Sequence, residues 1–92
     1  MLFVTDYRLK SHLKKDDVKR LMDEFGKRGA APGELTHYAR IDGSGGFTIS
    51  ENDDLKAAYE NVLAYTEFMT FTITPVLTIG DAVGPILAYT SR

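Results

Sequence analysis

The segment from Arg40 to Glu51, RIDGSGGFTISE, has the residue types and much of the spacing of a twelve-residue calcium loop. Asp42 stands at position 3, Ser44 at position 5, Gly45 at the sharp-turn position 6 and Glu51 at position 12. Position 1, however, is a cation, Arg40, where an EF-hand needs an acidic ligand. The preceding PGELTHYA favours a strand rather than the required helix. The segment therefore does not predict a calcium site.

A phosphate-binding loop is the second chemistry that these glycines suggest. Such a loop needs its glycines between a strand and the N-terminus of a helix. Gly43, Gly45 and Gly46 instead join two strand-like segments, and no Lys follows in the position of a P-loop lysine. We therefore expect the turn of a β-hairpin, in which glycine supplies positive φ angles.

Other reactive side chains are few. The chain has no Cys, which excludes disulfides, thiolate metal sites and cysteine nucleophiles. Of its two histidines, His12 is expected in solvent, and His37 as a structural residue on the helix side or edge of a sheet. Two histidines without a local carboxylate pattern do not predict a metal site. We assign no catalytic residue and no cofactor.

The elements that position these residues follow from hydrophobic spacing. Val18, Leu21, Met22 and Phe25 follow the pattern of a helix with one buried stripe. Runs rich in β-branched and aromatic residues predict strands. The expected elements are a strand at 2–9, a helix at 14–29, strands at 35–41 and 47–50, a helix from about residue 53, and a strand at 68–76.

This order predicts an α+β, ferredoxin-like βαββαβ domain, an antiparallel sheet with two helices on one face. Asn52 or Asp53 is expected to cap the second helix, and Pro75 places the last strand at a sheet edge or its terminus. The chain is expected to be a single domain over 1–92, with a core at about 1–77. The extension, 78–92, is expected to form one or two helical turns interrupted by Gly84 and Pro85.

Alternation along the strands divides their side chains between the two faces of the sheet. The face under the helices is assigned Leu2, Val4, Phe47, Ile49, Phe71 and Ile73. These residues are expected to meet Val18, Leu21, Phe25, Leu55, Tyr59 and Val62 of the helices. The open face is assigned Phe3, Thr5, Tyr7, Tyr38, Arg40, Thr48, Thr70, Thr72 and Thr74. Three large aromatic residues on an uncovered sheet predict a homodimer that packs two sheets together.

Several motifs resemble a family of short bacterial domains of unknown function within the dimeric α/β-barrel superfamily. They are DGSGGF, the Asn52–Asp54 cap, FTITPV, the opening MLFVTDY and the loop from Gly29 to Gly33, which together span roughly residues 1–77. The resemblance implies a ferredoxin-like fold and a homodimer forming a dimeric α/β barrel, and it implies no activity. Family members often carry a His after an aromatic residue in the strand before the glycines, where this chain has Ala39 after Tyr38. A histidine role is therefore not transferred.

Three functions remain open. The first is binding of a small amphipathic, fatty-acid-like molecule between two sheets. Its site would comprise Phe3, Thr5, Tyr7, Tyr38, Arg40, Thr48, Thr70 and Thr72. Arg40 would bind a carboxylate; alternatively the tyrosines fill the dimer interface and Arg40 pairs across that interface with an acid such as Asp6 or Asp42.

The second is a cofactor-less monooxygenase or isomerase, as the resemblance implies, for which His37, Asp6 and the tyrosines are the available acid–base groups.

The third is binding of single-stranded RNA, since LFVTDY resembles the first strand of the RNA-recognition motif. Gly45, Phe47 and Ile49 lack one of that motif's stacking rings, and the net charge is −2. We therefore expect no nucleic-acid partner.

Composition limits the location of the protein. No apolar run approaches the ~18 residues of a membrane span, and MLFVTDY lacks the pattern of a signal peptide. The sequence predicts a cytoplasmic protein without a membrane partner.

Overall fold

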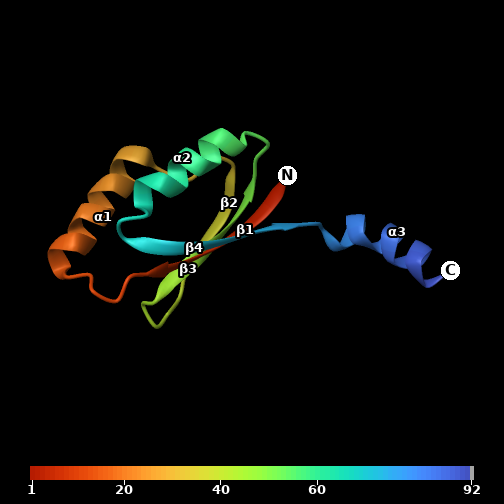
Figure 1. Cartoon of the computed structure of the whole chain (residues 1–92), viewed down its shortest axis with the longest axis horizontal. Coiled ribbons are helices and arrows are strands. Elements are labelled where there is room, and N and C mark those ends of the chain that lie inside the picture. The colour runs from red at the N-terminus through yellow and green to blue at the C-terminus, as the bar shows by residue number, and fades with distance from the viewer. Residues whose placement is uncertain (92) are drawn as a thin grey trace.

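A computed structural model describes residues 1–91 of the chain. Two helices lie on one side of a four-stranded sheet, and a third helix projects beyond it (Figure 1). This is the expected ferredoxin-like α+β order, with a C-terminal helix added. The elements are β1 (Leu2–Leu9), α1 (Lys15–Arg28), β2 (Glu34–Ala39), β3 (Gly45–Glu51), α2 (Leu55–Tyr65), β4 (Met69–Val76) and α3 (Ile79–Thr90).

The sheet is antiparallel throughout, in the order β2-β3-β1-β4. β4 therefore lies at an edge, as Pro75 predicts, because proline donates no hydrogen bond to a neighbouring strand. The turn between β2 and β3 is a hairpin with positive φ at Gly43 (77°) and Gly45 (149°). Asp42 stabilises the turn, since its Oδ1 accepts from the Ser44 backbone N–H at 3.0 Å and from the Ser44 hydroxyl at 2.7 Å.

Local hydrogen bonds fix the start of both covering helices. Asp17 Oδ2 accepts from the backbone N–H of Lys14, the N-cap of α1, at 2.8 Å. The N-cap of α2 is Asp54, whose Oδ1 accepts from the Ala57 backbone N–H at 3.0 Å. This corrects the expected cap, because Asn52 instead accepts from the Asp54 backbone N–H and forms the turn that precedes the helix.

The register corrects the faces assigned to β1 and β3. Thr5 lies opposite Thr48 of β3 and Ile73 of β4, so these three side chains share one face. Because Phe71 and Ile73 face the helices as expected, Phe3, Thr5, Tyr7 and Thr48 face them too. Leu2, Val4, Phe47 and Ile49 belong to the open face, together with Tyr38, Thr70, Thr72 and Thr74.

The physical reason for this shift is the complementary size of neighbouring side chains. On the helix side, β1 carries the bulky Phe3 and Tyr7, and β3 carries the small Gly46 and Ser50. Small residues on one strand make room for rings from the next, and hydrophobicity along β3 alone does not reveal this. The apolar Phe47 and Ile49 therefore lie on the open face.

The tightly packed core is confined to one end of the domain, around Tyr65, Phe68 and Met69. Tyr7, Leu9, Leu13, Leu21, Ala64 and Phe71 pack against these three residues. Toward the other end, side chains such as Leu55, Tyr59 and Ile73 remain about half exposed. The helices and the sheet are therefore packed most tightly around Tyr65.

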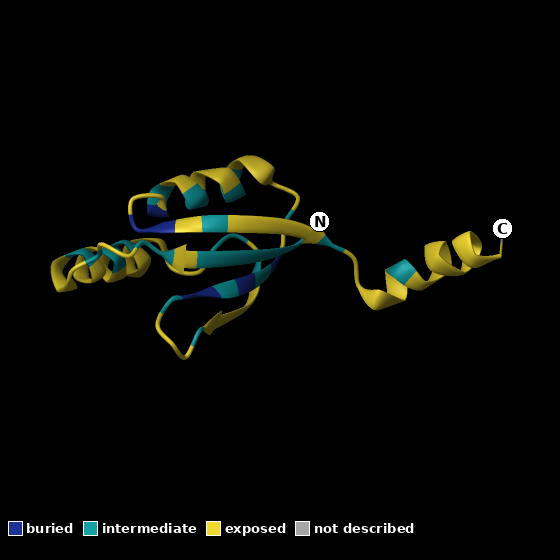
Figure 2. Ribbon diagram, turned by 60° about the horizontal axis from the view of Figure 1, so that its bottom comes forward, coloured by how far each residue is buried: buried dark blue, intermediate teal, exposed yellow. Residues whose placement is uncertain are grey.

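The C-terminal segment forms one continuous helix rather than the interrupted turns that were expected. Thr78 caps it by accepting from the Asp81 backbone N–H at 3.1 Å, and Pro85 lies inside it. Proline costs one hydrogen bond at this position, but the helix continues through it. Nearly the whole of α3 is exposed (Figure 2), including the apolar Ile79, Ile86, Leu87 and Tyr89.

Candidate ligand-binding site

A cavity of about 860 Å³ lies between the helices and the sheet. Its walls are mainly apolar: Phe3 and Phe71 come from the sheet, Leu21 and Phe25 from α1, and Val62 from α2. Well-packed protein interiors leave few voids larger than a water molecule, and ligand sites commonly enclose about 300–1,000 Å³. The space is therefore of the size and lining that suit a small apolar molecule.

One wall of the cavity carries a chain of three polar side chains. The Tyr7 hydroxyl and His37 Nε2 are 2.6 Å apart, and the two rings meet edge to face. On the far side of the imidazole, Nδ1 lies 3.7 Å from Glu34 Oε1. The side chains of Glu34 and His37 are 15% and 32% exposed. β1 supplies Tyr7 and β2 supplies the other two, and all three line the cavity.

The Tyr7 ring occupies space that Gly46 leaves free. A Cβ atom at Gly46 would lie 2.5 Å from the Tyr7 hydroxyl oxygen and 2.8 Å from Cζ. Burial, and secondly the negative charge of Glu34, raises the pKa of the Tyr7 phenol above its ordinary value. Tyr7 therefore holds its proton at neutral pH, and its hydroxyl is available for hydrogen bonding.

Three polar groups of lining residues have no hydrogen-bond partner within residues 1–91, and one of them is Nε of Arg40. Tyr65, 7% exposed, buries a hydroxyl without a hydrogen bond, and Asn52 Nδ2 is likewise unpaired. Both residues line the cavity. Burial raises the pKa of the Tyr65 phenol, which keeps its proton. A buried donor without a partner costs about 1–3 kcal/mol, so these groups are suited to a ligand that accepts hydrogen bonds.

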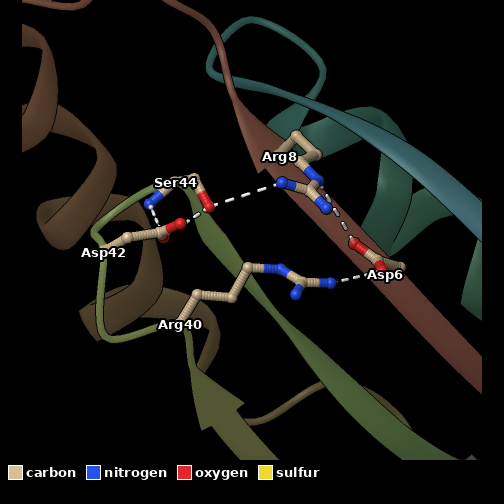
Figure 3. Close-up of polar contacts among 5 residues, drawn as sticks. All are labelled: Asp6, Arg8, Arg40, Asp42 and Ser44. Carbon is tan, nitrogen blue, oxygen red and sulfur yellow. Dashed lines mark hydrogen bonds and ion pairs between the residues drawn. The ribbon is translucent and has the colours of Figure 1, made fainter.

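Arg40 forms an ion pair with Asp6. It is also a lining residue, but Nη2 of its guanidinium donates to Asp6 Oδ2 at 2.6 Å, across β3 (Figure 3). The neighbouring Arg8 approaches Asp6 Oδ1 at 3.9 Å and donates to the Ser44 hydroxyl at 3.5 Å. Arg40 therefore pairs with Asp6 of its own chain, whereas the sequence suggested a pairing across a dimer interface.

The eight residues proposed from the sequence divide between the two faces. Phe3, Thr5, Tyr7 and Thr48 line the helix–sheet cavity, as does Arg40. Tyr38, Thr70 and Thr72 lie on the open face. The structure therefore does not bring the eight together in one site between two sheets.

Sequence reasoning missed Glu34 and Tyr65. Glu34 precedes His37 by three residues, but alternation along a regular strand would place these two side chains on opposite faces. The register of β2 shifts between Glu34 and Thr36, which allows both side chains to line the same cavity. The one sequence signal for this pair was that Glu34 lies close to His37 at the start of an expected strand.

The open face of β1 carries no aromatic ring, because Phe3 and Tyr7 point toward the helices. The ring pair on that face is Tyr38 and Phe47, whose centroids lie 5.5 Å apart.

Among the described residues, no helix combines the length and the apolar character needed to cross a membrane.

Comparison with curated proteins gives no significant match. A family model described as a domain of unknown function (DUF3303) matches residues 1–88, and the chain belongs to this family.

Proposed function

We propose that this domain binds a small, mainly apolar molecule in the cavity between its helices and its sheet. The observation that carries the proposal is the cavity of about 860 Å³ with walls of aromatic and aliphatic side chains. A ligand that excludes water from the uncovered apolar surface of the cavity stabilises the complex by about 25 cal/mol per Å² of apolar surface buried. The site differs from the one expected between two sheets.

The polar groups at the cavity favour a ligand with a hydrogen-bonding end. The unpaired Tyr65 hydroxyl and Asn52 Nδ2 donate to ligand oxygens, and the Tyr7–His37 pair orients a second polar group. Because Asp6 neutralises Arg40, a fatty-acid carboxylate has less to gain from that guanidinium than the sequence alone suggested. An apolar body with a neutral polar end fits these groups best.

A fluorescence titration with N-phenylnaphthylamine, a neutral apolar probe, tests this proposal. We expect saturable binding of the probe, because the cavity is mainly apolar and large enough to hold it. Ala58→Phe, which fills space at a lining position, weakens binding about 10-fold. Ala57→Phe is the matched control, since Ala57 is its neighbour on α2 but is not a lining residue. Absence of binding, or equal loss in both variants, would contradict a site between the helices and the sheet.

The domain is further proposed to act as a homodimer, with a second copy of this chain covering the open face of the sheet. Val4, Phe47 and Ile49 give that face an apolar patch, beside which Arg40 is paired with Asp6. The exposed apolar residues of α3 are a second surface in need of a partner. In a two-fold symmetric dimer, α3 of each copy can lie on the open face of the partner's sheet, so that both apolar surfaces of each copy are covered. Native mass spectrometry is expected to give a dimer, and a monomer at micromolar concentration would refute this.

A further inference from the structure

We propose that Tyr7, His37 and Glu34 form a proton relay in which Tyr7 is the catalytic acid–base residue for tautomerisation of a neutral carbonyl compound. This inference rests on the proposed ligand binding in the helix–sheet cavity and assigns a chemical class to the ligand. It uses three side chains that the two strands β1 and β2 bring to one wall.

The Tyr7 hydroxyl is hydrogen-bonded to His37 Nε2, and the Glu34 carboxylate lies 3.7 Å from Nδ1, close enough to act on the imidazole by its charge but beyond direct hydrogen-bond distance. The carboxylate of Glu34 on the Nδ1 side favours a proton on that nitrogen, which leaves Nε2 to accept from the Tyr7 hydroxyl at 2.6 Å. When His37 takes the Tyr7 proton, the nearby Glu34 stabilises the imidazolium that forms. Glu34 is a positioning residue, since it acts through His37 and not on the ligand.

The surroundings select the class of substrate. Glu34 adds a negative charge to a mainly apolar cavity, which disfavours anionic ligands near the relay. Tyr65 lines the same cavity and belongs to the packed cluster against which Tyr7 rests, and its buried hydroxyl has no partner within the described residues. A carbonyl oxygen is the acceptor that this hydroxyl lacks, and the hydrogen bond strengthens as the oxygen becomes an enolate.

The proposed step balances without a cofactor. A C–H bond next to the carbonyl breaks, its electron pair forms the enolate, and the proton bonds to the Tyr7 oxygen as the Tyr7 proton passes to His37 Nε2. The Tyr65 hydroxyl donates to the enolate oxygen meanwhile. Return of the proton to the original carbon, or to a conjugated carbon, restores the relay. The product is the substrate or an isomer of it.

Proton exchange of ketones in deuterium oxide, followed by proton NMR, tests the relay without knowledge of the natural substrate. The probes are tetralone, acetophenone and decanone, each first shown to displace N-phenylnaphthylamine from the protein. We expect the wild-type chain to accelerate exchange at the carbon next to the carbonyl for a ketone that binds. Tyr7→Phe, which keeps the ring, is expected to reduce this acceleration about 100-fold or more. Tyr38→Phe, on the open face, leaves it unchanged.

Glu34→Gln separates a positioning role from a merely structural one. We expect a smaller loss of exchange rate together with a shift of the His37 tautomer away from Nδ1–H, measured by nitrogen NMR of the imidazole. An unchanged tautomer would overturn the role of Glu34. Full exchange activity in Tyr7→Phe, or no acceleration with any ketone that displaces the probe, would overturn the relay. Failure of the probe itself to bind would instead refute the proposed ligand site.

Discussion

At the scale of single residues, the absence of a side chain at Gly46 decides where the Tyr7 ring lies. A methyl group there would meet the Tyr7 hydroxyl, 2.5 Å away, and the carbonyl oxygen of Tyr38. The Tyr7 ring cannot easily move away from such a methyl group, because its hydroxyl is hydrogen-bonded to His37. The backbone of Tyr7 cannot easily move either, because β1 is a central strand of the sheet. The position of Tyr7 in the cavity wall therefore depends on Gly46, which is not itself a lining residue.

Gly46→Ala is accordingly expected to destabilise the domain by about 1–3 kcal/mol through overpacking. The control is Gly26→Ala in α1, where an added Cβ meets nothing within 4 Å. That change is expected to stabilise the helix by about 0.5–1 kcal/mol, because alanine loses less backbone entropy than glycine. Urea denaturation followed by circular dichroism measures both. Equal effects of the two substitutions would contradict the close approach of Tyr7 to Gly46.

At the scale of elements, α3 projects beyond the sheet and is exposed along nearly its whole length (Figure 1). Isolated helices of this length are marginal in water, and α3 contains two glycines and Pro85. Its apolar residues recur at helical spacing on one side, with Ile79, Val83 and Ile86 exposed. We therefore expect a partner surface to stabilise α3, and the proposed dimer would supply one.

Ile86→Asp in α3 is expected to weaken the dimer at least about 10-fold, because a charge would replace a side chain buried against the partner. Ala88→Asp places the same charge on the opposite side of the same helix, so it is the matched control. Analytical ultracentrifugation of both full-length variants measures the dissociation constant. Equal effects of the two variants would show that this face of α3 is not the contact.

The order of the elements follows well from the sequence, because hydrophobic spacing and glycine-rich turns are local signals. Residues 2–9 form a strand as expected, and the expected helix at 14–29 is found as Lys15–Arg28. The length of α3 was not foreseen, since Gly84 and Pro85 usually end a helix and here do not. The residue that caps α2 also differed, because three consecutive polar residues offer equivalent caps.

At the scale of the whole molecule, the faces of β1 and β3 depend on how strands pair, and that information is not local. A one-residue shift exchanges the two faces of a strand. Along β1, Leu2 and Val4 are as apolar as Phe3 and Tyr7, so alternation alone did not select the correct set. The candidate site moved with this correction, from the space between two sheets to the space between helices and sheet.

The most direct test of the account is methyl-resolved NMR of the full chain titrated with N-phenylnaphthylamine. Leu21, Val62 and Ile73 report on the helix–sheet cavity. The methyl groups that report on the open face are those of Val4, Ile49 and Val76. We predict saturable shifts at the cavity methyl groups, with the open-face methyl groups unperturbed. Shifts confined to the open-face methyl groups would contradict a ligand site between the helices and the sheet.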